Sequence, residues 1–167
     1  MNIVDAIIQE YTYEAANTRK VLERVPEDQM GWKPHQKSMS LGQLASHIAE
    51  TPLWVKDMVQ TDVFEMNPET YTPFLAANRA ELLQAHDDNA AQAVAILTGQ
   101  SDAHMLATWR MTVGGKTVIE LPRVAVVRSF LISHTIHHRG QLTVYLRMHD
   151  VPLPSLYGPS ADEPGFA

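Results

Sequence analysis

Two histidines one helical turn apart are the residues of this sequence best placed to do chemistry. His134 and His138 stand in the segment Ser-His-Thr-Ile-His-His-Arg-Gly-Gln. On an α-helix, residues four apart share a face, with their Cβ atoms about 5–6 Å from each other. Two imidazole nitrogens in this arrangement can bind one divalent ion at about 2.0–2.1 Å each. The spacing therefore predicts part of a metal site.

His47 is the candidate for a third metal ligand. It lies on the apolar face of a predicted helix, where Leu44 and Trp54 occur at helical spacing. A histidine on such a face must find a polar partner, because an unpaired buried polar group costs free energy. If this helix packs beside the one that carries His134 and His138, three neutral nitrogens meet and leave positions open for water or substrate.

Three further side chains are candidates for the surroundings of the metal. Gln141 follows His138 by one helical turn and Tyr145 by two, while Glu50 follows His47 by three residues. Each is placed to orient an imidazole or a bound water molecule. The alternatives are core packing for Tyr145 and a capping or solvated role for Gln141 and Glu50.

The helical phase distinguishes His138 from its neighbour His137. With about 100° per residue and His134 at zero, His138 falls near 40°, inside the apolar stripe, and His137 near −60°. His138 is therefore predicted as the ligand. Arg139 is expected to point away from the ligands, into a salt bridge or an interface. The remaining histidines have no partner at ligand spacing and are expected at the surface or in loops: His35, His86, His104 and His149.

Four helices are predicted to position these residues, at about 2–24, 41–60, 73–97 and 122–148. Asn2 and Ser40 are N-cap candidates for the first two. Pro52 interrupts the second and predicts a kink or a break there. The stretch 61–73 shows no periodicity and is expected to be a connector.

A short β-hairpin is predicted before the last helix. Polar and apolar residues alternate from Thr108 to Val113, and Gly114-Gly115 then precedes a β-prone run. The proline-rich segment 151–167 is expected to be an extended tail. The 167 residues are thus predicted to form one domain, residues 1–167, of the all-α class, a four-helix bundle with one small hairpin.

Composition excludes several classes of function. Thirteen Lys and Arg residues against nineteen Asp and Glu give a net charge of −6, which disfavours nucleic-acid binding. Cysteine is absent, so disulfides and thiolate nucleophiles are excluded and a reducing cytoplasm is expected. No stretch approaches the roughly 18 apolar residues of a membrane span, and the N-terminus lacks the basic region of a signal peptide. We therefore expect a cytoplasmic protein with no membrane and no nucleic-acid partner.

The segment from Trp32 to Glu50, with His47 near its end, and the later His134-xxx-His138-Arg-Gly-Gln motif resemble the DinB/YfiT-like family of damage-inducible metalloproteins. The resemblance covers nearly the whole chain in order and spacing. It implies an up-down-down-up four-helix bundle, usually dimeric. It also implies a divalent metal (zinc, nickel or iron) bound by His47, His134 and His138. Characterised relatives include transferases and isomerases that use low-molecular-weight thiols.

These observations favour a metal-dependent enzyme that activates a small thiol or water. Because the chain has no cysteine, a thiol nucleophile would come from a cosubstrate, and the reaction would be thiol transfer to a small electrophile. Hydrolysis is the second enzymatic possibility, with Glu50 as the general base. The alternative is a non-catalytic dimeric metal- or ligand-binding module of a stress response. A homodimer is expected because the last helix carries a second uncharged line, which a second subunit or another element of the same chain must cover: Ala125, Ile132, Ile136 and Thr143.

Overall fold

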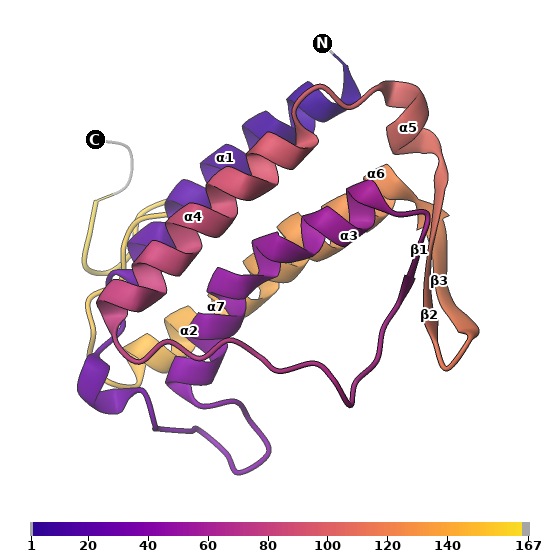
Figure 1. The fold of residues 1–167 in the computed structure, drawn as a ribbon. Helices are drawn as coiled ribbons and strands as arrows, with labels where there is room; N and C mark the ends of the chain where they lie inside the picture. The colour runs from indigo at the N-terminus through magenta and orange to yellow at the C-terminus, as the bar shows by residue number, and fades with distance from the viewer. Residues whose placement is uncertain (1, 165–167) are drawn as a thin grey trace.

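The computed structural model describes residues 2–164, and most of them are helical (Figure 1). The long helices are α1 (Ile3–Leu22), α2 (Leu41–Glu50), α4 (Arg79–Leu97) and α7 (His134–Arg147). The shorter helical segments are η1 (Glu27–Gln29), η2 (Thr51–Trp54), α3 (Val55–Gln60), α5 (Asp102–Leu106), α6 (Arg123–Val127) and η3 (Arg128–Ser133). The strands are β1 (Val63–Glu65), β2 (Thr108–Val113) and β3 (Lys116–Pro122).

Capping side chains fix where the first two long helices begin. The Asn2 side chain accepts a hydrogen bond from the backbone N–H of Asp5, and the Asp5 carboxylate accepts one from Asn2. Ser40 and Gln43 form the same reciprocal pair at the start of α2. Such capping boxes satisfy N–H groups that have no partner within the helix. Both predicted N-caps are thus confirmed.

The region after α2 differs in part from the expectation. Around Pro52 the helix tightens into the 3-10 segment η2 before it resumes as α3, as the proline predicted. The third long helix begins at Arg79 and not near residue 73, so that prediction was wrong. Asn78 caps α4 by accepting from the N–H of Glu81, and the Ser46 hydroxyl accepts from the N–H of Ala76. These two hydrogen bonds hold the residues before Arg79 outside α4.

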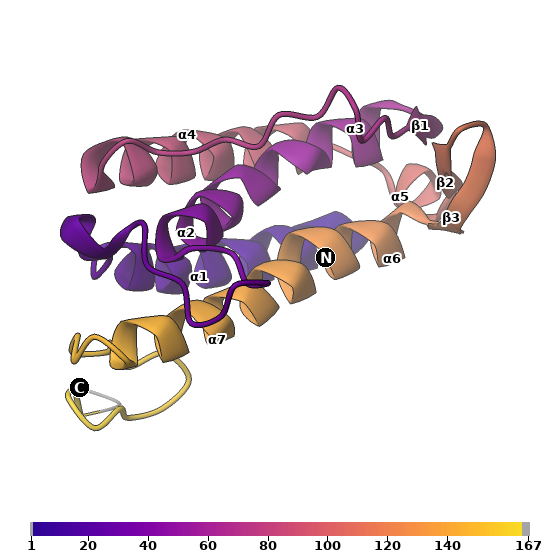
Figure 2. The same cartoon turned by 90° about the horizontal axis from the view of Figure 1, so that it is seen from below.

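A small mixed sheet lies at one end of the helices (Figures 1 and 2). β2 and β3 pair antiparallel across Gly114 and Gly115, both of which have positive φ (56° and 74°) that glycine adopts without strain. β1 pairs parallel to β2, with Val63 opposite Arg110. The expected hairpin therefore describes only part of the sheet, because the third strand comes from the stretch predicted as a connector.

The last helical region is not one regular α-helix. A π-helical segment, η3, separates α6 from α7 and shifts the helical phase between them. Ile132 is buried, 1% exposed, and Ile136 packs against the same core cluster. Part of the uncharged line on which the homodimer expectation rested is therefore covered by this chain itself.

The helices enclose two apolar clusters. α1 and α2 each pack against both α4 and α7, so helices distant in sequence surround a common interior (Figures 1 and 2). One cluster, around Ile7, Val126 and Leu131, lies toward the sheet. The other, around Leu44, Leu82 and Leu142, lies toward the opposite end. The second cluster holds α2, which carries His47, while α7, which carries His134, packs against both clusters.

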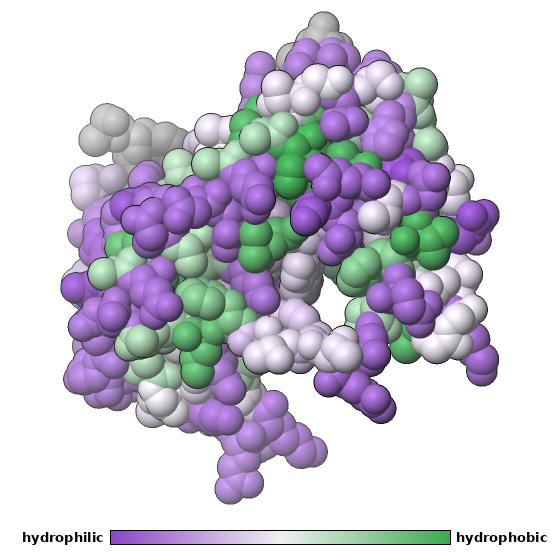
Figure 3. All heavy atoms as spheres, viewed as in Figure 1, coloured by the Kyte–Doolittle hydropathy of each residue, from purple (hydrophilic) through white to green (hydrophobic). Residues whose placement is uncertain are grey.

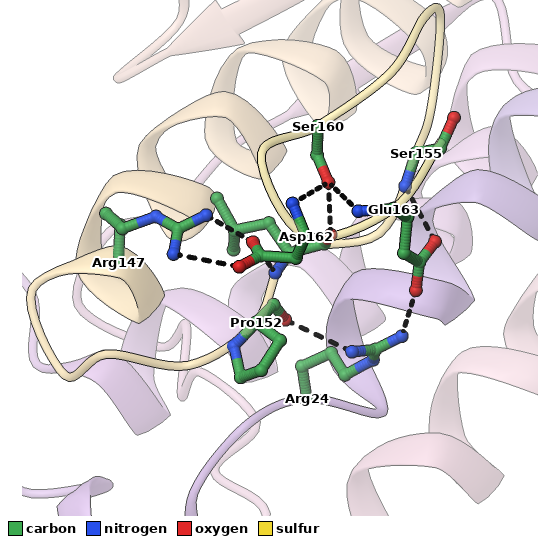
Figure 4. A network of polar contacts seen from close by, with 8 residues as sticks. Arg24, Arg147, Pro152, Ser155, Ser160, Asp162 and Glu163 are labelled. Carbon is green, nitrogen blue, oxygen red and sulfur yellow. Dashed lines mark hydrogen bonds and ion pairs between the residues drawn. The ribbon is translucent and has the colours of Figure 1, made fainter. Parts of the chain in front are cut away.

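The segment after α7 has no helix or strand, yet polar contacts hold it on the helices (Figure 4). Arg147 pairs with Asp162, and Arg24 of the α1 end binds Glu163 at 2.6 Å. The Ser160 hydroxyl accepts from the N–H groups of both acidic residues, at 3.1 and 2.9 Å. The predicted tail is thus ordered loop as far as residue 164; its residues 165–167, like residue 1, lie outside the described residues.

Within residues 2–164, none of the helices has the length and apolar character needed to cross a membrane.

Candidate metal centre

Three histidines from two helices converge on one point. His47 comes from α2, and His134 and His138 come from successive turns of α7. One ring nitrogen of each lies within 4.8 Å of the others, and Nε2 of His47 is 2.9 Å from Nε2 of His134. The ring centroids are 4.7 Å apart for His47 and His138 and 4.4 Å apart for His134 and His138. These are the three residues expected as ligands from the sequence.

Burial keeps the three imidazoles neutral. It lowers the pKa of His47 to about 4 and that of His134 to about 4, and the neighbouring His138 adds repulsion in both cases. The pKa of His138 is also lowered, chiefly by burial. A neutral imidazole has one nitrogen with a free lone pair, which is the form that binds a divalent metal. The donor set therefore fits a zinc-like ion of the kind that three-histidine sites bind.

Gln141 fixes the tautomer of His138. Its side-chain Oε1 lies 2.8 Å from His138 Nδ1. Because an amide oxygen only accepts, Nδ1 carries the proton and Nε2 has the free lone pair. Metal-binding histidines commonly have such a partner on the second nitrogen. His137 is exposed and is not one of the three clustered histidines.

The other two candidate neighbours differ from each other. Glu50 is 8% exposed and accepts a hydrogen bond of 2.8 Å from the Tyr71 hydroxyl. Tyr145 packs edge-on against Trp32, with ring centroids 5.5 Å apart, so its packing alternative describes it better. Tyr71 was not anticipated, because it lies in an aperiodic segment and nothing in its sequence neighbourhood points to Glu50.

Aromatic side chains lie beside the histidines at the edge of a large pocket. The Trp54 ring centroid is 5.4 Å from that of His47 and 5.3 Å from that of His134. Phe130 lies 6.3 Å from His134. Trp54, Phe130, His47 and Glu50 all line a pocket of about 1090 Å³, so a small molecule there would reach the edge of the histidine cluster.

Arg139 and His86 are both buried, and only His86 departs from the expectation. Arg139 does form a salt bridge, but it is 2% exposed and binds the buried Glu14 carboxylate at 2.6 Å. His86 is 3% exposed and not at the surface; its Nε2 donates to the backbone carbonyl of Ala15 at 3.1 Å. The helical phase alone could not reveal that α1 supplies a buried partner for each of them.

Comparisons with known proteins find a matching family and a similar sequence. The model of the DinB family matches residues 1–164. The uncharacterized protein YrdA of Bacillus subtilis (strain 168) is 26% identical over 161 residues, which cover 96% of this chain and 91% of YrdA.

Solved structures share the fold. A DinB-like protein from Bacillus cereus ATCC 10987 superposes with a TM-score of 0.69 at 22% identity, covering 92% of this chain and 97% of its own. A DinB-like protein from Bacillus subtilis gives 0.67 at 21%, covering 89% and 95%. The mycothiol-dependent maleylpyruvate isomerase gives 0.54 at 10% and covers 92% of this chain and 65% of its own.

Proposed function

The chain belongs to the DinB family, and from that premise we propose that it is a metal-dependent enzyme acting on a small electrophilic molecule. The observation that supports this most is the convergence of His47, His134 and His138 beside a pocket of about 1090 Å³. Zinc, nickel or iron is the metal we propose. Three protein ligands leave coordination positions free, as catalytic sites require and closed structural sites do not.

The residues of this chain have separate roles in the proposal. His47, His134 and His138 hold the metal through neutral nitrogens, and Gln141 keeps His138 in the tautomer that binds. When bound, a divalent metal supplies Lewis-acid chemistry and lowers the pKa of a water or thiol. The Trp54 ring packs against His47 and His134 at the edge of the pocket and helps to orient their imidazoles.

A small thiol is the first choice of nucleophile. The chain has no cysteine, so a thiol must come from a cosubstrate. The structural similarity to a mycothiol-dependent isomerase supports this choice, although only the fold is shared at 10% identity. Hydrolysis is the second candidate, because Glu50 lines the pocket and is placed to act as a general base toward water.

We extend the proposal to the assembly and the setting of the protein. The contacts of α1 and α2 with α4 and α7 support an up-down-down-up four-helix bundle. We propose a homodimer in the cytoplasm that binds no nucleic acid, in keeping with the net charge of −6. Sedimentation at micromolar concentration tests the dimer, and a mobility-shift assay at low salt tests the exclusion of nucleic acid.

Metal analysis followed by an activity screen tests the function. The protein is purified without added metal, its metal content is measured, and it is then loaded with zinc, nickel or iron. Loaded protein is mixed with chlorodinitrobenzene and a panel of low-molecular-weight thiols, and the His47→Ala variant serves as the inactive control. One metal per chain with thiol transfer above the control supports the proposal. One metal without exchangeable water or any turnover would favour the non-catalytic metal-binding alternative.

A further inference from the structure

The large pocket lies beneath the segment between β1 and α4, residues 66–78. This segment overlaps the stretch 61–73 predicted as a connector, and from here on the name connector means residues 66–78. In Figure 1 the connector descends from β1, passes below α3 and crosses in front of α2, and Figure 3 shows this face hollowed beside it. The pocket is bordered by the connector, by α2 and α3, and by the sheet. Only His47 of the histidine cluster lines it, so most of its volume is available to a ligand that does not touch the metal.

The lining of the pocket is rich in aromatic side chains. Six of them line it: Trp54, Phe64, Tyr71, Phe74, Trp109 and Phe130. Its rim also carries large apolar side chains that remain exposed, namely Met39 (42%) and Leu75 (59%). Exposed apolar side chains at the mouth of a cavity indicate a binding site, because folding normally covers apolar surface and a bound ligand would cover what remains. The body of the ligand is therefore apolar.

The buried polar group of the pocket accepts hydrogen bonds and does not donate them. Glu50 Oε2 accepts from the Tyr71 hydroxyl, and the pKa of Tyr71 is raised to about 12, mainly by burial, so that hydroxyl keeps its proton. The proton is already directed at Glu50, which leaves the second carboxylate oxygen as an acceptor. A ligand group that donates, or that is positively charged, complements it, and aromatic faces also favour a cation.

The charges at the mouth do not reverse this preference. Lys33 and Lys37 line the pocket but are exposed, where water and salt screen them. Two further carboxylates line the pocket. Glu65 already accepts from Thr112 and from the N–H of Gly115, and Asp57 is only partly buried. Glu50 is the one buried carboxylate of the three, at 8% exposed, and it therefore sets the polarity of the ligand.

We propose that this pocket binds an apolar, preferably aromatic, small molecule whose polar end is an amine or another hydrogen-bond donor directed at Glu50. The proposal rests on the proposed function in one respect only: if the metal centre is catalytic, the ligand of the pocket is its substrate. The recognition itself uses the pocket residues and needs no metal.

Tryptophan fluorescence with three matched probes tests the proposal. Trp54 and Trp109 line the pocket, so a bound ligand changes their emission. Phenylbutylamine, phenylbutanol and phenylbutyrate share one apolar body and differ in the polar end. We expect the amine to bind about tenfold more tightly than the alcohol, because both can donate to the Glu50 carboxylate but only the ammonium group adds an ion pair to that hydrogen bond. The carboxylate is expected to bind most weakly. Equal affinity for all three, preference for the carboxylate, or no binding would overturn the proposal.

Two substitutions locate the preference. Glu50→Gln should abolish the advantage of the amine over the alcohol, whereas Glu65→Gln, the matched control, should leave it unchanged. If both variants retain the advantage, Glu50 is not the recognising group and the proposal fails. Circular dichroism checks that each variant is folded. If Glu50→Gln does not fold, the order of affinities of the three probes for the wild-type protein still tests the proposal.

Metal content separates this proposal from the proposed function. The titrations are run on protein treated with a chelator and on protein loaded with zinc. An amine preference in both samples, with no metal binding, would refute only the metal-dependent function. Normal metal binding without the amine preference would refute only the ligand class.

Discussion

The ion pair between Arg139 and Glu14 offers the sharpest test of how the metal-binding helix is held. It joins α7 to α1 directly beside His138, and its side chains are 2% and 7% exposed. Nη2 of Arg139 lies 2.6 Å from the carboxylate, while Nη1 donates to the Glu14 carbonyl at 3.0 Å and to the Thr18 hydroxyl at 3.1 Å. The Tyr157 hydroxyl also donates to the same carboxylate, at 2.6 Å.

Glu14→Gln removes the negative charge without changing the size of the side chain. Arg139 then stays buried without a counter-charge, and breaking a buried pair in this way costs about 3–5 kcal/mol. Because glutamine retains an acceptor oxygen, we expect the lower end, about 3 kcal/mol of unfolding free energy. For a chain of this size that corresponds to a fall in Tm of roughly 6–12 °C.

A second ion pair between the same two regions provides the matched control. Arg128 of η3 binds Glu10 of α1 at 2.6 Å, but these side chains are 52% and 37% exposed. Glu10→Gln should therefore cost less than about 1 kcal/mol. Urea denaturation of both variants at pH 7 measures the difference. Equal losses for the two, or a loss below about 1 kcal/mol for Glu14→Gln, would show that burial of the pair is not what matters.

Two further predictions concern other histidines and their partners. Burial lowers the pKa of His86 in the folded protein, so its stabilising effect is complete above about pH 6.5 and is lost as the pH falls below that value. The free energy of unfolding should thus decline less between pH 7 and pH 5 in His86→Gln than in the wild type; an equal decline would contradict this. Gln141→Ala should weaken metal binding by about 10–100-fold through His138, while Tyr145→Phe should leave it unchanged, as isothermal calorimetry can measure.

Local patterns explain what the sequence could predict. The caps at Asn2 and Ser40, the irregularity at Pro52 and the turn at Gly114-Gly115 depend on residues within a few positions of each other. The family motif likewise placed His47, His134 and His138 together before any coordinates, since it records which distant residues belong to one site.

Contacts between distant segments explain what the sequence could not predict. β1 exists because it pairs with β2, forty-odd positions later, at Val63 opposite Arg110. The π-helical segment η3 breaks the constant angle per residue on which the helical-phase argument depended. The burial of Arg139 and His86 required knowing that α1 presents Glu14 and the Ala15 carbonyl to them. Tyr71 reaches Glu50 from a segment without periodicity.

Zinc binding to single histidine variants tests the central claim most directly. Calorimetry is carried out on the wild type, on His47→Ala, His134→Ala and His138→Ala, and on His137→Ala, which removes an exposed neighbour of the cluster. We predict one zinc per chain for the wild type and for His137→Ala, and no binding by the other three at concentrations that saturate the wild type. A wild-type protein that binds no metal would contradict the account, as would a His137→Ala protein that loses zinc while His138→Ala retains it.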